Sequence, residues 1–501
     1  MGLDVFISRS TDKAMLAASS LLVALMASGC GGNIKFEKTA DELVAKMERD
    51  GAVVPIAAGI KPSRIDRSAS LAGFAMAAAE SSPSVASAKR LLMAAESRVV
   101  EAQREFYPQV ALSSDATDTH QVIVESSNSS LEGDDTKYNT TNIALTASLR
   151  LVDLPMSASV VAARHEAEAR AADYEASKQD ILQSVLSSYT EAAEALERWT
   201  LAQAEVKYYI ARSDFEQRQS EAGEMRASDL SVAAAELARA RSDASIASAD
   251  YRIRADRLCG LAFNTLCPYP AAVSNSASLP APIQMTQEEI DEVAQSPEIR
   301  AMSARVNVAL REVDRARMAM YPRLSLEISA AQRDRGGSLF DGSSLSRSED
   351  VSVLFQWDLY TSGRLKSIRD AELNEALAAG HEYEVQLQTA VNDMRGAGSA
   401  LRALWEHDRS LNRVVQLRRS AVGEIQQEIS AGVATTLELA EARLDLVRVE
   451  VLRQRTRRNY LAATLARARA TGKIDEELIA MIDKVLSDDR NSVRVYGPIA
   501  R

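Results

Sequence analysis

Alternating apolar and polar residues mark four short segments of the chain and predict four β-strands. In Arg323–Ala330 the apolar residues occupy every even position, the period of a strand with one buried face. Polar loops rich in Gly, Ser and Asp, Ser126–Asn139 and Arg333–Glu349, separate the members of each pair, so each pair is interpreted as a hairpin. The strands are expected at about 109–124, 141–152, 323–332 and 350–359.

The rest of the patterned chain predicts helices of unusual length. Met156–Gln219 contains neither proline nor glycine, and its 64 residues would extend about 96 Å as a helix. Such helices are too long for a globular core, so we expect them to pack as antiparallel coiled-coil hairpins. Glycines within Arg364–Ser430 predict bends or breaks there. Further long helices are expected at Ala227–Leu258 and Thr435–Ala470, and the interrupting glycines are Gly380, Gly396, Gly398 and Gly423.

Two halves of the chain repeat one order of landmarks, which indicates an internal duplication. Each half runs from a Ser-Pro step to a Tyr-Pro step over the same interval, beginning at Ser82 and again 214 residues later at Ser296. Later landmarks stay close to this offset: Gly223 pairs with Gly432, and Gly260 with Gly472. The expected parts are a signal peptide (1–29), an N-terminal arm (30–69), a first repeat (70–280), a second repeat (281–472) and a C-terminal tail (473–501) with a short amphipathic helix.

The N-terminus and the cysteines indicate an exported protein. Ala14–Ala27 is an uncharged apolar run that is too short to span a bilayer but suits a signal peptide. Cys30 follows small residues that resemble a bacterial lipobox and is the candidate lipid anchor, the alternative being an ordinary signal peptide with a chance cysteine. Cys259 and Cys267 either close a small disulfide loop, as an oxidising periplasm would allow, or remain two thiols.

Composition and motifs give little support to an enzyme. The four histidines are scattered without metal-ligand spacing, and no nucleotide-binding loop or nucleophile motif is present. A net charge of −11 argues against nucleic-acid binding. We therefore expect no cofactor, no metal and no catalytic residue. The arginines within Arg453–Arg458 and Arg467–Arg469 are interpreted as a solvated helix face.

Four strands leave two open edges, which hydrocarbon does not tolerate. Their length of roughly 9–11 residues suits a tilted membrane strand. Three chains would supply twelve strands, enough for an outer-membrane barrel with a lipid-facing apolar surface. The alternative is a soluble four-stranded sheet covered by helices.

With these landmarks the chain resembles the TolC-like outer-membrane efflux and secretion channels over about residues 70–472. The resemblance rests on the Ser-Pro steps, on Pro108 and Pro322 before the strands, and on the aromatic turn Trp357–Gly363. It implies a mainly α protein with a membrane β-barrel: a homotrimer with a 12-stranded barrel in outer-membrane lipid and an α-helical periplasmic tube. The implied partners are a periplasmic membrane-fusion adaptor and an inner-membrane transporter of the RND or ABC type.

The resemblance also assigns roles to two helical hairpin tips that match the family pattern. In the family the tips contact the adaptor, and Ser228 or Thr435 is expected to cap the following helix. Acidic residues six and nine positions after the second tip glycine line the family's periplasmic constriction, which implies that Glu438 and Glu441, with Asp229 in the first copy, do so here. The alternative is solvated surface charge. The expected tip contacts are Gly223, Met225, Ser228, Leu230, Gly432, Val433, Thr435 and Leu437.

The expected function is that of a passive exit duct for a tripartite efflux pump or a type I secretion system, located in the outer membrane with a large periplasmic part. The aromatic turn slightly favours protein secretion over drug export. The rival expectation is a periplasmic coiled-coil adaptor or an envelope-spacing lipoprotein without a channel. The cargo does not follow from the sequence.

Overall fold

The structure is a computed structural model of the 501-residue chain. The chain divides into two units, Met1–Ile60 and Lys61–Arg501, and everything below concerns the second. The structure describes residues 64–66, 69–125, 135–224, 226–263, 265–271, 273, 278–282, 286–337 and 342–487. The expected signal peptide, and Cys30 with it, lie outside these residues.

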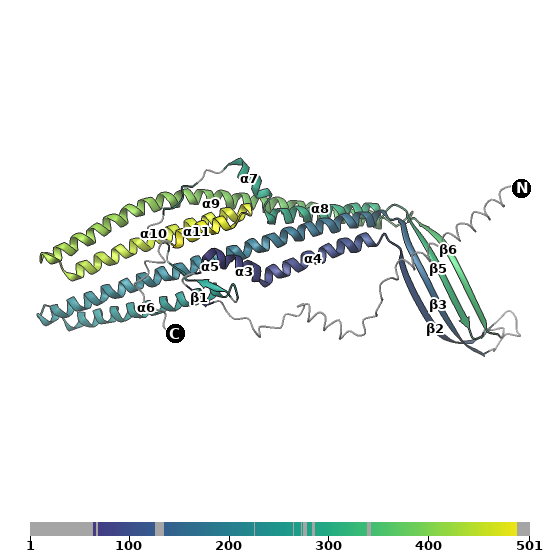
Figure 1. The fold of residues 1–501 in the computed structure, drawn as a ribbon, viewed down its shortest axis with the longest axis horizontal. Helices are drawn as coiled ribbons and strands as arrows, with labels where there is room; N and C mark the ends of the chain where they lie inside the picture. The colour runs from purple at the N-terminus through teal and green to yellow at the C-terminus, as the bar shows by residue number, and fades with distance from the viewer. Residues whose placement is uncertain are drawn as a thin grey trace. The chain divides into compact units, whose positions relative to one another are not determined.

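Long helices and four long strands make up most of the described unit (Figure 1). The strands of the larger sheet are β2 (Gln109–Val122), β3 (Asp135–Val152), β5 (Arg323–Arg335) and β6 (Ser344–Gln356), and two short strands are β1 (Arg64–Asp66) and β4 (Leu266–Pro268). The helices are α3 (Leu71–Ser81), α4 (Pro83–Arg104), α5 (Leu154–Glu221), α6 (Ala227–Cys259), α7 (Gln287–Ala294), α8 (Pro297–Met318), α9 (Arg364–Ser430), α10 (Thr436–Thr471) and α11 (Glu476–Ser487).

The larger sheet is antiparallel with the order β2-β3-β5-β6, so that β2 and β6 are its two edges. The two expected hairpins are present and are joined by pairing of β3 with β5. The strands are longer than predicted, at 13 to 18 residues, because polar residues assigned to the loops continue the ladder. Asn139 pairs with Asp118, for example, although the sequence placed it in a loop. Backbone pairing does not require an apolar side chain, so alternation underestimates strand length.

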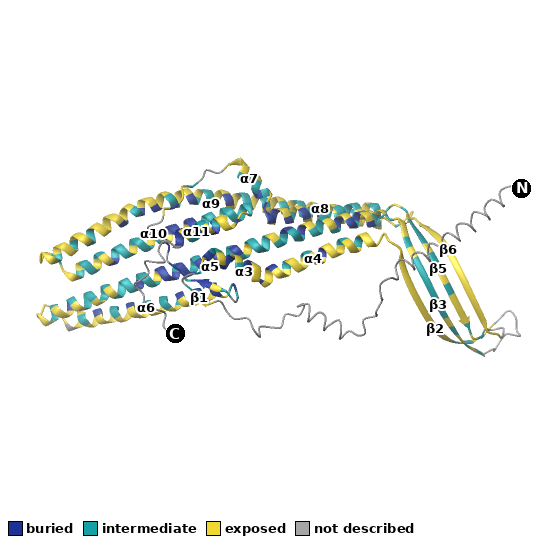
Figure 2. Cartoon of the chain, viewed as in Figure 1, coloured by how far each residue is buried: buried dark blue, intermediate teal, exposed yellow. Residues whose placement is uncertain are grey.

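The apolar residues on one face of the sheet are concentrated in the half next to the helices. Leu326 stands between Leu149 and Val353 in the ladder, and all three belong to the same face. Every residue of β6 is exposed, so nothing in the described chain covers either face of this edge strand. The predicted alternative of a sheet covered by its own helices is therefore wrong. Figure 2 shows the same exposure along β2 and β6.

The long helices form two hairpins, α5 with α6 and α9 with α10, whose bounds lie within a few residues of those predicted (Figure 1). The predicted breaks in α9 are wrong, because the helix is continuous from Arg364 to Ser430 through all four glycines. A glycine costs a helix interior only about 1 kcal/mol, which the remaining hydrogen bonds and packing offset. α5 also contacts α10, so the two hairpins lie against each other.

The two copies turn from strand to helix in different ways. In the first copy β3 is followed directly by α5, and Asp153 caps the helix by accepting a hydrogen bond from the Met156 amide at 3.2 Å. In the second copy seven residues separate β6 from α9, and Gly363 adopts a left-handed conformation with φ of 81° at the helix start. The first copy has no glycine at this turn, because its Asp cap needs no positive φ.

In the main hydrophobic core, α3 from the beginning of the second unit and α11 from its end pack against the middle of the long helices α5 and α10 (Figure 2). α11 contributes buried Ile479 and Leu486, so residues 476–487 belong to the core and not to a tail. β1 pairs in parallel with β4, which ties the end of the expected arm to the same region. Cys259 and Cys267 form a disulfide within this core, so the sequence's two alternatives resolve in favour of the bond. Other core members are Leu71, Phe74, Leu186, Tyr189 and Leu461.

Three arginines of α10 are buried, which contradicts the predicted solvated face. Arg453, Arg457 and Arg458 are all at most 6% exposed. They are tolerated because carboxylates face them: Asp408 of α9 accepts from Arg453 Nε at 2.9 Å, and Glu197 of α5 accepts from Arg458. Buried charges of this kind need partners that also lie away from water. A single sequence shows the arginines but not the two distant carboxylates that receive them.

Replacing Gly472 by alanine is expected to destabilise the protein by about 2–4 kcal/mol. Gly472 ends α10 with φ of +71°, and an added Cβ would lie 2.3 Å from Pro297 Cδ at the start of α8. Gly423→Ala is the matched control: it lies inside α9 with nothing within 4 Å of the added atom, so it should stabilise by about 0.5–1 kcal/mol. Denaturant midpoints of the two variants measure the difference, and a Gly472→Ala variant as stable as Gly423→Ala would contradict the close approach of Gly472 to Pro297.

Candidate functional site

The two hairpin tips share one backbone geometry. Gly223 and Gly432 both adopt left-handed conformations, with φ of 77° and 78°. In each tip the amide of the residue after the glycine donates back to the helix: Glu224 N to Gln219 O, and Val433 N to Glu428 O, both at 2.9 Å. This is the six-residue turn that ends a helix when a glycine accepts a positive φ. The spacing of glycines in the sequence therefore locates both tips.

The starts of the two return helices differ. Thr435 caps α10 as predicted: its hydroxyl accepts from the Glu438 amide at 3.2 Å, and Glu438 Oε2 accepts from the Thr435 amide at 2.6 Å. Ser228 does not cap α6, because the helix already begins at Ala227 and Arg226 occupies the cap position without a side-chain bond. These two reciprocal hydrogen bonds form a capping box, which the spacing Thr-x-x-Glu in the sequence indicates. Our sequence interpretation missed this signal.

The three candidate gate residues are all exposed and lie close to the tips. Asp229 is in the first turn of α6, whereas Glu438 and Glu441 lie one turn apart at the start of α10. Among the described residues, no hydrogen bond or ion pair joins Asp229 to either glutamate. Glu438 already serves the cap, and its hydrogen bonds to Thr435 lower the pKa of its carboxyl below the usual value. Acidic side chains at these positions also suit the positive end of a helix.

The cap predicts an acid-sensitive tip. Because the pKa of Glu438 is lower in the folded state, its contribution to stability is complete above the ordinary value near 4.5 and is lost as the pH falls through the lowered pKa. We expect the protection of the Thr435 amide against hydrogen exchange to fall over that acidic range, after correction for the intrinsic rate. Glu438→Ala should remove the protection at every pH, whereas Glu441→Ala, one turn further along, should leave it unchanged.

The predicted contact residues form an exposed surface at both tips. Val433 is 78% exposed, which is unusual for a valine in a structured turn. Leu230 and Leu437 are half-buried, because each lies on the first turn of its return helix. Gly223, Ser228, Gly432 and Thr435 are exposed, and Met225 lies outside the described residues.

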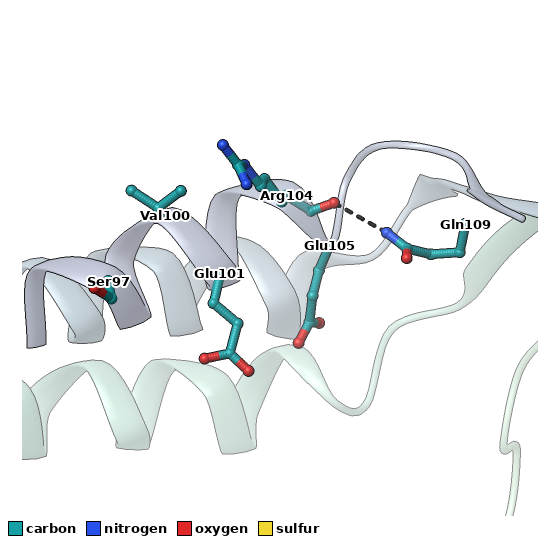
Figure 3. A pocket seen from close by; sticks show the side chains of 6 residues that line it. All are labelled: Ser97, Val100, Glu101, Arg104, Glu105 and Gln109. Atoms are coloured by element: carbon teal, nitrogen blue, oxygen red, sulfur yellow. Dashed lines mark hydrogen bonds between the residues drawn. The ribbon is translucent and has the colours of Figure 1, made fainter. Parts of the chain in front are cut away.

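A surface depression of about 590 Å³ lies away from the tips, where α4 meets β2 (Figure 3). Figure 3 shows the carboxylates of Glu101 and Glu105 on the same side of α4, with Val100 and Arg104 on the other. Gln109 closes the turn by donating to the Arg104 carbonyl at 3.2 Å. Both carboxylates are at a helix end next to solvent, and nothing there resembles a catalytic pair. In the part of the chain that the structure describes, no group of three His, Cys, Asp or Glu side chains is arranged to hold a metal ion.

No described helix combines the length and the apolar character that crossing a bilayer requires.

Comparison with known proteins decides the family. The family model "Outer membrane efflux protein" matches residues 75–262 and 291–473, which together make up most of the chain and coincide with its two repeats. The chain belongs to this family. Membership places this outer membrane efflux protein in the outer membrane, and it agrees with the TolC-like resemblance deduced from the Ser-Pro steps and hairpin tips.

Individual relatives are distant but consistent. The alkaline protease secretion protein AprF of Pseudomonas aeruginosa is 24% identical over 313 residues, or 61% of this chain and 65% of AprF. The outer membrane efflux protein BepC of Brucella suis is 24% identical over 260 residues, or 50% of this chain and 52% of BepC. The match thus spans less than two thirds of either relative. The crystal structure of the Campylobacter jejuni CmeC outer membrane channel shares the fold, with a TM-score of 0.68 and 17% identity over 83% of this chain and 89% of CmeC.

Proposed function

We propose that the chain is one of three identical subunits of an outer-membrane channel. The observation that carries this proposal is the uncovered edge strand β6, all of whose residues are exposed, together with the opposite edge β2. Unpaired strand edges present backbone groups that hydrocarbon cannot satisfy. Joining β6 of one copy to β2 of the next closes the sheet without any further element. Three copies give a twelve-stranded barrel, within the range of outer-membrane proteins.

The face of the sheet supports the same assembly. The apolar band around Leu149, Leu326 and Val353 would face lipid, and the alternating residues Ser325, Glu327 and Ser352 would face a wet lumen. The polar outer halves of the strands would then extend beyond the hydrocarbon, which accounts for strands longer than the 9–11 residues needed to cross it. The long helices would continue the lumen as a periplasmic tube, and Cys30 would anchor the N-terminus to lipid.

We further propose that this channel is the exit duct of a tripartite system. One relative, AprF, is named for protease secretion and the other, BepC, for efflux, at equal identity. The longer match to AprF favours type I secretion. Energy would come from an inner-membrane transporter of the RND or ABC type, and a periplasmic adaptor would contact the exposed tips around Val433. The duct is passive, without cofactor or catalytic step.

The decisive experiment measures the mass and location of the native protein. We expect detergent extracts of the outer-membrane fraction to contain a trimer, and planar bilayers with the purified trimer to conduct ions. A monomer released without detergent would overturn the channel and leave the coiled-coil adaptor or spacer as the function.

The gate can be tested in the same bilayers. We propose that Glu441, with Glu438 and Asp229, lines a periplasmic constriction, where rings of carboxylates favour cations and bind polyvalent ones. Glu441→Gln is expected to lower the selectivity for K⁺ over Cl⁻ and to weaken block by a trivalent cation. Glu424→Gln, an exposed position on α9 before the same tip, is the control and should change neither. Equal effects of the two variants would contradict a ring at Glu441.

A further inference from the structure

Two arginines lie together on one face of the sheet at the end of β5. Arg333 and Arg335 are two positions apart on this strand, so their side chains leave the sheet on the same face. Glu327, which would face the lumen in the proposed barrel, shares that face because it is an even number of positions from both. β5 begins beside the helices and ends at Arg335 (Figure 1). Both arginines would therefore face the lumen at its outer end, away from the periplasmic tube.

The strands on either side of β5 offer Arg335 no carboxylate. It is paired with Thr140 of β3 and Ser344 of β6 in the ladder. Thr117 of β2 completes this row, so none of its four residues is acidic. Among the described residues, neither Arg335 nor Arg333 forms an ion pair. Two positive charges of each chain are thus available to a ligand in the lumen.

One carboxylate lies at the level of Arg333. Asp115 of β2 belongs to the same row but is two strands away, or about 9.6 Å at the usual strand spacing. Its Oδ1 already accepts a hydrogen bond from Asn142 Nδ2 at 3.1 Å. Asp115 therefore offsets part of the charge at the level of Arg333, whereas the next row outward, that of Arg335, keeps its full charge.

The guanidinium group of Arg335 is held beside an aromatic ring. Its Cζ lies 5.9 Å from the centroid of the Tyr138 ring, within the range of a cation–π interaction. Its Nε is shielded from solvent and has no hydrogen-bond acceptor among the described residues. A positioned guanidinium with an unused donor is suited to a carboxylate or phosphate group, which accepts two of its hydrogen bonds at once.

The same face of the sheet carries the opposite charge nearer the periplasm. Glu327 of β5 and Asp350 of β6 lie there in neighbouring rows. Arg335 is eight residues from Glu327, or about 26 Å along the strand. Salt screens charges beyond about 8 Å at physiological ionic strength, so the acidic rows do not cancel the arginines. The lumen of the proposed barrel thus changes sign along its axis, from acidic inside to basic outside.

We propose that Arg333 and Arg335 of the three subunits form a ring that binds polyvalent anions at the outer end of the lumen. Rings of arginine or lysine favour anions in pores, as acidic rings favour cations. The ligand is a molecule with several phosphate or carboxylate groups, which either enters from outside the cell or leaves as cargo. The ring needs three chains around one lumen, and so it rests on the channel function proposed above.

Block of the channel in planar bilayers tests the ring, with inositol hexakisphosphate as the probe. Protein added to one compartment leaves its long helices there, so the outer mouth opens into the opposite compartment. We expect the probe to lower the conductance from the mouth side, and the block to weaken as KCl rises. Block from the mouth side alone identifies an external anion as the ligand, whereas block from both sides identifies anionic cargo. Either result supports the ring if the block requires the arginines.

Variants show whether the arginines are required. Arg335→Gln is expected to raise the half-blocking concentration about tenfold or more, because a charged hydrogen-bond donor is lost from each subunit. Arg333→Gln combined with Arg335→Gln should abolish the block. Arg347→Gln is the matched control: Arg347 pairs with Gln332, one position from Arg333, and lies on the opposite face of the sheet. An equal effect of Arg347→Gln and Arg335→Gln would overturn the ring.

The native mass, measured first, separates failure of the ring from failure of the channel. A conducting trimer whose block survives the loss of both arginines overturns the ring and leaves the channel intact. A protein that does not form a trimer overturns both. If the trimer forms but does not conduct, equilibrium dialysis of inositol hexakisphosphate against the detergent-extracted protein measures binding without ion flow. The same variants then apply, and binding that does not depend on Arg333 and Arg335 would contradict the inference.

Discussion

Replacing Val353 by arginine is expected to abolish the outer-membrane trimer. Val353 is 62% exposed at the centre of the apolar band on edge strand β6. In the proposed barrel it faces hydrocarbon, where an arginine costs about 2–4 kcal/mol near the midplane. The cost recurs in each of three subunits, which is enough to prevent stable insertion. Membrane fractionation followed by native mass measurement of the detergent extract checks the result.

The neighbouring residue provides the matched control. Ser352→Arg introduces the same side chain on the opposite face of β6, where it would meet water in the lumen and lie across from Glu327. We expect Ser352→Arg to insert normally and to lower the cation conductance of the trimer. If Ser352→Arg were lost from the membrane and Val353→Arg retained, the assignment of the two faces would be reversed.

Replacing Asp408 by leucine is expected to destabilise the protein by about 3–5 kcal/mol. Asp408 is 6% exposed and is the carboxylate that Arg453 and Arg457 approach on α9. Its removal leaves buried positive charge without that partner. Unfolding by denaturant in detergent, at a fixed protein concentration because oligomers depend on it, measures the loss.

Two further variants separate burial from charge. Asp445→Leu removes a carboxylate of α10 that pairs with Arg418 of α9 and with Arg448 of its own helix. Both pairs are partly exposed, so the expected loss is below about 1 kcal/mol. Combining Asp408→Leu with Arg453→Leu and Arg457→Met should recover most of the lost stability, since well-packed apolar groups replace buried ions readily. Equal losses at Asp408 and Asp445 would contradict the burial of the ion pairs that Asp408 makes with Arg453 and Arg457.

The elements of the fold could be predicted from the sequence because each has a strong local signal. Helices without proline and strands with strict alternation, such as Arg323–Ala330, were located to within a few residues. The strand ends could not be predicted, because Asn139 and its neighbours join the ladder through backbone bonds that leave no hydrophobic pattern. The burial of Arg457 could not be predicted from the sequence either, since its carboxylate partner Asp408 lies 49 positions away on another helix.

The candidate site was predictable in part. The turns at the two tips could be predicted from Gly223 and Gly432, because few other residues accept the positive φ that these turns require. The helix starts were less well predicted, since Ser228 lies just inside α6 and Glu438 serves as a cap. The constriction stays a prediction: a ring of charges belongs to three chains, and one chain determines only that Glu441 is exposed near a tip.

The disulfide between Cys259 and Cys267 bears on when the chain can finish folding. Cys259 ends α6 and is the last-turn residue near the end of the first matched segment, whereas Cys267 lies in β4, in the stretch between residues 262 and 291 that the family match omits. Such bonds do not persist in the reducing cytoplasm. The core that gathers α3, α11 and β1 therefore acquires its covalent closure only after export. Oxidation thus separates two stages of biogenesis: crossing of the inner membrane comes first, and covalent completion of this core comes second.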